Sequence, residues 1–130
     1  MIRRFVEIIE KNINATSTIL FSNIQKHFGP DSKTVYIRGT LTFADSSVLE
    51  IAIFADELHR TVNINKYRFH YMDKHGNMIF RYDNAPHHHE MPLFPHHKHF
   101  PDRVVESTIP SLKDVLNEIS AIIIKNQPPH

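Results

Sequence analysis

Hydrophobic residues recur at steps of three and four over the first 28 positions. They are Ile2, Phe5, Val6, Ile9, Ile13, Leu20, Ile24 and Phe28. This spacing predicts an amphipathic helix. Its middle, NINATST (residues 12–18), is poor in strong helix formers, so the segment is expected to be one helix or two consecutive ones. Gly29-Pro30 ends either version.

Apolar and polar residues then alternate, a pattern that predicts four antiparallel strands over 34–43, 48–55, 66–72 and 77–83. If the last turn consists of DKHG (73–76), Tyr71 lies opposite Met78, Phe69 opposite Phe80 and Tyr67 opposite Tyr82. One face of this hairpin is then aromatic. The residues of its other face are Arg68, His70, Arg81 and Asp83.

The final element is a predicted helix over 111–126, with Ser111 and Asp114 placed as a capping box and Asn126 near its end. The fold class is therefore α+β, with helices packed on the apolar face of an antiparallel sheet. The residues expected in the core include Ile51, Ile53, Phe69, Phe80, Leu116 and Ile119.

A long segment, residues 84–110, separates the last predicted strand from this helix and shows no clear periodicity. Loops of this length in compact domains are usually functional or disordered. An ordered, packed loop rich in His and Pro is favoured by Pro86, Pro92, Pro95 and Pro101, which are interspersed with Met, Leu and Phe. Its histidine runs are internal and interrupted, so they belong to the protein and are not an affinity tag.

Composition narrows the class of protein. A chain of 130 residues, 41% of them hydrophobic, is expected to form a single domain, 1–130. The net charge of +1 lacks the basic excess of a protein that coats nucleic acid nonspecifically, although eleven histidines would add positive charge on mild acidification. With no cysteine, signal peptide or membrane-spanning run in the sequence, we expect a cytoplasmic protein with no membrane partner.

Three short motifs carry a resemblance to a known family. YRFHY (67–71), RYDNAPHH (81–88) and FPHHKH (94–99) resemble the TumE-like family of small prokaryotic proteins. Its members are encoded beside a helix-turn-helix antitoxin and are regarded as toxins of toxin-antitoxin pairs. The resemblance therefore implies a toxin function and a cognate helix-turn-helix antitoxin as partner. The predicted order of helices and strands is also similar to RelE-type and barnase-type ribonucleases, which is an analogy of fold.

The side chains of the predicted polar face and the loop suit metal-independent cleavage of RNA. Histidine provides a general base and a general acid near neutral pH, and arginine stabilises the charge on phosphate. The candidate catalytic residues are His70, His87, His88, His97, His99, Arg68, Arg81 and Asp83. The expected partners are RNA and the antitoxin, no cofactor or metal is assigned, and a homodimer is left open.

Two alternatives remain at this stage. His97-x-His99, with Asp83 and His87 or His88, has the ligand types of a catalytic Zn²⁺ site, although no established zinc motif is present. Lys98, lying between two of these histidines, would oppose a dication and favour a phosphate, which argues for the metal-independent reading. The second alternative is a non-enzymatic binding module that docks a partner on the histidine-rich loop.

Overall fold

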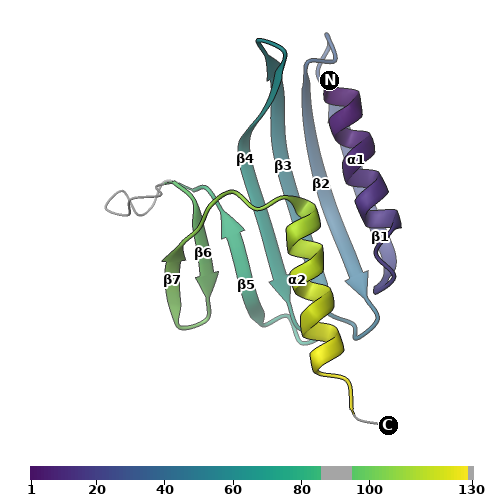
Figure 1. Cartoon of the computed structure of the whole chain (residues 1–130), viewed down its shortest axis with the longest axis vertical. Helices are drawn as coiled ribbons and strands as arrows, with labels where there is room; N and C mark the ends of the chain where they lie inside the picture. The colour runs from purple at the N-terminus through teal and green to yellow at the C-terminus, as the bar shows by residue number, and fades with distance from the viewer. Residues whose placement is uncertain (86–94, 129–130) are drawn as a thin grey trace.

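The structure, a computed structural model, describes residues 1–85 and 95–128, which form one antiparallel sheet and two helices (Figure 1). The elements in chain order are α1 (Ile2–Asn14), β1 (Ile19–Phe28), β2 (Thr34–Phe43), β3 (Val48–Leu58), β4 (Thr61–Met72), β5 (Met78–Asp83), β6 (His97–Phe100), β7 (Arg103–Glu106) and α2 (Leu112–Lys125). The strands lie in the order β1 to β7, so each pairs with its neighbour in sequence. The α+β class is confirmed, but the described sheet has seven strands and not four.

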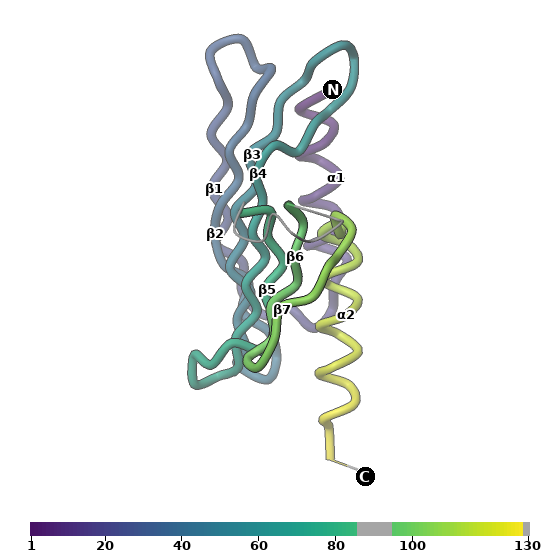
Figure 2. The backbone as a smooth tube through the Cα atoms, turned by 90° about the vertical axis from the view of Figure 1, so that its left-hand side faces the viewer, coloured from purple at the N-terminus to yellow at the C-terminus, as the bar shows by residue number. Residues whose placement is uncertain are grey.

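Both helices lie on the same face of the sheet (Figure 2). Strand residues on this face are buried against them, because side chains alternate between the two faces of a strand. All six residues expected in the core are buried, with at most 3% of their surface exposed. The capping box at the start of α2 is also present, with Ser111 accepting from the Asp114 backbone N–H. The other face of the sheet, here called the open face, carries no helix (Figure 2).

The segment 19–28, predicted as helix, is the edge strand β1. Leu20, Ile24 and Phe28 are spaced by four residues, which is both about one helical turn and two repeats of strand alternation, so this spacing does not distinguish the two. From Ser22 to Phe28 the even-numbered side chains face α1, whereas an irregularity beside Leu20 leaves that residue exposed and packs Ile19 against the core. Lys26 donates to Glu10 over 2.9 Å, and the Arg3 guanidinium lies 4.9 Å from the Phe28 ring centroid. These contacts hold a mostly exposed strand against the helix.

The segment 84–110, expected to be a loop, contains the hairpin of β6 and β7. A two-residue turn, Pro101-Asp102, joins the strands, because Phe100 pairs with Arg103. Lys98 lies on the helix-covered face, where its Nζ is 2.6 Å from Glu118 Oε2 and 5.0 Å from the Phe80 ring centroid. These interactions attach β6 to α2. His97 and His99, on alternate positions, are consequently directed to the open face.

The β4–β5 pairing differs from prediction by two residues. Phe69 lies opposite Tyr82 and Tyr71 opposite Phe80, with an irregularity beside Met72. Because the shift is even, the side chains from Phe80 to Asp83 remain on their predicted faces. Met78, expected opposite Tyr71, instead pairs with Met72 beyond the irregularity. Strand β4 also begins five residues earlier than the expected position 66. Its turn is formed by His59 and Arg60, both at positive φ, and non-glycine residues at such positions give little sequence signal.

Phe69 and Phe80 provide a test of the face assignment. Each is at most 2% exposed, so we expect Phe69→Ala or Phe80→Ala to lower the free energy of unfolding by about 3 to 5 kcal/mol. Phe21→Ala is the control, since Phe21 is 69% exposed and its truncation should change stability by less than about 0.5 kcal/mol. Urea unfolding measures both. Near-wild-type stability of the two core variants would contradict the assignment.

Candidate functional site

Antiparallel pairing aligns the polar side chains of the open face into rows that run across the strands. One row, here called the histidine row, contains Glu50, His70, Arg81 and His99 as successive cross-strand partners. The adjacent row, here called the Asp83 row, contains Ala52, Arg68, Asp83 and His97. Residues that are distant in sequence are therefore neighbours, at a spacing of about 4.8 Å between strands.

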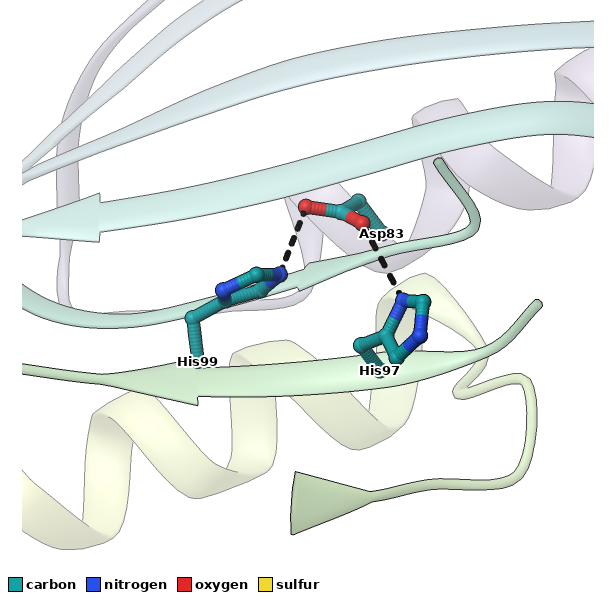
Figure 3. A group of neighbouring side chains, drawn as sticks. All are labelled: Asp83, His97 and His99. Carbon is teal, nitrogen blue, oxygen red and sulfur yellow. Dashed lines mark ion pairs between the residues drawn. The ribbon is translucent and has the colours of Figure 1, made fainter. Parts of the chain in front are cut away.

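Asp83 is the most buried carboxylate of the site and contacts three side chains, of which Figure 3 shows His97 and His99. Its Oδ2 accepts from Arg81 Nε over 2.9 Å and lies 3.2 Å from His99 Nε2. Its Oδ1 accepts from the Ala85 backbone N–H and lies 3.8 Å from His97 Nδ1. A buried carboxylate requires hydrogen bonds and positively charged neighbours, because burying it unpaired would raise the free energy of the folded state. These contacts fix Asp83, Arg81 and His99 relative to one another.

His70 and His99 occupy opposite sides of Arg81 in the histidine row. Burial lowers the pKa of His70, and the charge of Arg68 lowers it further, although Glu50 opposes this effect from 3.8 Å. Burial also lowers the pKa of His99, whereas Asp83 acts to raise it. Both imidazoles therefore titrate below the ordinary histidine pKa of about 6.5.

Six of the eight predicted site residues come together on the open face: Arg68, His70, Arg81, Asp83, His97 and His99. They differ in accessibility. His97 is fully buried, whereas the Arg68 side chain is half exposed and borders a hollow of about 440 Å³ that Arg81 and Asp83 also line. His87 and His88 lie outside the described residues.

Sequence reasoning missed two contributors. Glu50 approaches both His70 and Arg68, each over 3.8 Å, and only the β3–β4 register could have revealed it. His96 Nδ1 lies 3.0 Å from the Tyr67 hydroxyl, on the helix-covered face, and the two rings stack with centroids 5.8 Å apart. The strand alternation His-Lys-His-Phe was the available signal for β6. Histidine does not count as an apolar residue, so a hydrophobic pattern does not predict this strand.

The ligand types of a metal site are also present. One ligand atom each from Asp83, His97 and His99 lies within 4.8 Å of the others, and two imidazoles with a carboxylate suit Zn²⁺ or a related transition metal. Contrary to the expectation from the sequence, Lys98 does not oppose a dication at this site, because it lies on the other face with Glu118. Arg81 is the cation that would oppose a metal ion here, because its guanidinium is bound to the Asp83 carboxylate.

Comparison with known proteins places the chain in a family. A family model described as Toxin TumE matches residues 7–126. The chain belongs to the TumE family. The match includes all seven strands of the described residues, all of α2 and most of α1, and it confirms the resemblance seen in the sequence motifs. Membership in TumE indicates a toxin function, and a toxin of this kind implies an antitoxin partner.

No curated protein and no solved structure matches this TumE chain. The expected similarity to RelE-type and barnase-type folds therefore stays a prediction. Within the described part of the chain, neither helix is long and apolar enough to cross a membrane.

The lowered pKa values make stability depend on pH. A folded-state pKa below the unfolded value means that the folded protein binds fewer protons, so stability is complete above about pH 6.5 and is lost as pH falls. We expect the free energy of unfolding to be smaller at about pH 5.5 than at about pH 7.5. His99→Gln should reduce this difference, and the turn variant His75→Gln should not. Greater stability on acidification would contradict the site geometry.

Proposed function

We propose that this TumE family member is a toxin that cleaves RNA without a metal ion, using histidines as acid and base and arginines to stabilise phosphate. The observation that carries the proposal is the order of the histidine row, in which His70 and His99 flank Arg81. Cleavage of RNA by its own 2′-hydroxyl requires a base for that hydroxyl, an acid for the departing 5′-oxygen and a cation on the phosphate.

The spacing of the row supports this division of roles. His70 and His99 are two strand spacings apart, about 9 to 10 Å between their Cα atoms. In an in-line displacement the attacking and leaving oxygens lie on opposite sides of phosphorus, so the two imidazoles must also be on opposite sides. A phosphate bound at Arg81 would meet one imidazole on each side.

Electrostatics favours one assignment. Burial and the charges of Arg68 and Arg81 lower the pKa of His70 despite the opposing effect of Glu50, which favours the neutral state that a base requires. Asp83, 3.2 Å from His99, stabilises the imidazolium and so suits the general acid. We therefore propose His70 as the base that removes the 2′-hydroxyl proton. His99 then protonates the 5′-oxygen as the bond to phosphorus breaks.

The remaining residues have supporting roles in this proposal. Arg68 extends the positive charge beside Arg81, and Asp83 orients both His99 and the Arg81 guanidinium. His97 is fully buried behind Asp83, so it is proposed as a positioning residue without contact to RNA. His87 and His88, which the sequence also suggests as acid or base, lie outside the described residues and have no role in this assignment.

The proposed partners are RNA and an antitoxin of the helix-turn-helix type, acting in the cytoplasm. Support for the antitoxin comes from the family, whose name describes a toxin. A small helix-turn-helix gene adjacent to the gene of this chain would strengthen the assignment, and the absence of such a gene would count against it.

A second candidate function is metal-dependent hydrolysis. The specific observation in its favour is the approach of ligand atoms from Asp83, His97 and His99 to within 4.8 Å of one another. Zn²⁺ held there would supply a hydroxide nucleophile. The Arg81–Asp83 bond opposes this candidate, because a dication would compete with a guanidinium for one carboxylate.

Arg68→Ala tests phosphate stabilisation. Arg68 is a better target than Arg81, because removing Arg81 would leave the buried Asp83 without its closest cation. We expect the rate of RNA cleavage to fall by about 10²- to 10³-fold, with the thermal stability unchanged. Arg103→Ala is the matched control, since Arg103 is similarly exposed, at 58%, but lies on β7 beside Phe100. Full activity of Arg68→Ala would oppose the proposed role.

Exhaustive chelation separates the two candidate functions. The acid-base proposal predicts that cleavage survives chelation and has a bell-shaped pH dependence. The maximum of kcat/KM should lie below about pH 6.5, because His70 and His99 have lowered pKa values in the free protein. Activity that disappears with chelator and returns with Zn²⁺ would establish the metal-dependent candidate instead. Protein prepared without a metal-affinity column avoids adventitious metal.

A further inference from the structure

The open face continues beyond the site as a third row of cross-strand partners. This row, here called the aromatic row, contains His27, Tyr36, Phe54 and Lys66. It lies two residues along each strand from the Asp83 row, a distance of about 7 Å. Tyr36 and Phe54 are direct partners in the β2–β3 pair. Two aromatic residues are therefore cross-strand partners on the face that the helices leave uncovered.

These rings are not part of the core. Tyr36 is 38% exposed and Phe54 is 39% exposed, while the buried residues of β2 and β3 face the helices. Single exposed hydrophobic residues are common and need no explanation. Tyr36 and Phe54 differ from such residues because both line the hollow of about 440 Å³ that also reaches Arg68 and Arg81.

A second hollow, of about 400 Å³, extends this groove across the sheet. It shares Tyr36, Ala52 and Arg68 with the first. Ala52 lies between Arg38 and Arg68 in its row, and its methyl side chain leaves depth between the two arginines. The groove is thus continuous from the aromatic row to the residues proposed for cleavage.

The charge along the groove identifies the kind of occupant. Arg38, Lys66, Arg68 and Arg81 line its walls together with the carboxylates of Glu50 and Asp83, so cations outnumber anions four to two. Gln25 Oε1 accepts from Arg38 Nε over 3.3 Å. Cations beside exposed aromatic rings are the combination that binds single-stranded nucleic acid, because phosphates meet the cations and unpaired bases stack on the rings. A duplex would not offer its base faces to these rings.

We propose that Tyr36 and Phe54 form a stacking platform for unpaired bases next to the cleaved phosphate, with Lys66 and Arg38 on the RNA backbone. The substrate class is accordingly single-stranded RNA. The inference rests on the proposed function for the position of the cleaved phosphate. Recognition of single strands by the platform can nevertheless be measured without cleavage.

Binding to a short single-stranded RNA carrying 2′-O-methyl groups tests the platform directly, because this RNA lacks the attacking hydroxyl. We expect Tyr36→Ala and Phe54→Ala each to weaken binding by about tenfold or more in fluorescence anisotropy. Tyr36→Phe should retain wild-type affinity, since it keeps the ring. Phe21→Ala is the control for a general loss of exposed aromatic surface, because Phe21 lines neither hollow. The same RNA in a duplex should bind more weakly than the single strand.

Kinetics with cleavable RNA separates this inference from the proposed function. The platform predicts that Tyr36→Ala raises KM with little change in kcat, whereas Arg68→Ala lowers kcat. If the wild-type protein binds single strands through Tyr36 and Phe54 but does not cleave them, the proposed function fails and the platform stands. If cleavage occurs and both alanine variants bind like wild type, the platform is overturned. Equal affinity for duplex RNA, or loss of antitoxin binding alone in these variants, would also overturn it.

Discussion

Alternation of side chains along the strands, combined with helices on one face only, determines the rest of this structure. Residues such as Ile51, Phe69 and Phe80 are buried against α1 and α2, so their neighbours in sequence must face the other way. Antiparallel register then decides which of those neighbours meet. The polar rows of the open face thus follow from the same pattern that forms the core.

Attachment of β6 is the point at which the core and the candidate site depend on each other most directly. Lys98 approaches Glu118 of α2 on one face, while His97 and His99 approach Asp83 on the other. A slip of one residue in β6 would bring Lys98 toward Arg81 and remove both histidines from Asp83. Packing on the helix face therefore keeps the imidazoles in place.

The sequence predicted the fold class, the central strands and the faces of residues 68–71 and 80–83, because strict alternation carries that information. It misassigned 19–28, where Leu20, Ile24 and Phe28 fit both periods, and it placed 97–106 in a loop. The hydrophobic pattern does not reveal strand β6, because His97 is fully buried although histidine is a polar residue type. Pairing across the sheet is not encoded locally, so the row containing His70, Arg81 and His99 became visible only in the structure.

The TumE family match indicates a toxin. The chemistry has to be inferred from the residues of the candidate site. Arg81 is central to both candidate mechanisms: it supplies the cation for a phosphate in one, and it competes with a metal ion for Asp83 in the other. The Arg81 guanidinium and a dication would compete for the same Asp83 carboxylate.

The low proton affinity of His70 and His99 links occupation of the site to proton uptake. In the free protein near neutral pH, both imidazoles are mainly without their second proton. An anion placed between them favours the imidazolium, because it offsets the positive potential of Arg68 and Arg81. Thermodynamic linkage then requires that a phosphate on the histidine row binds more tightly as the solution becomes more acidic. The substrate would itself help to create the acid that completes its cleavage.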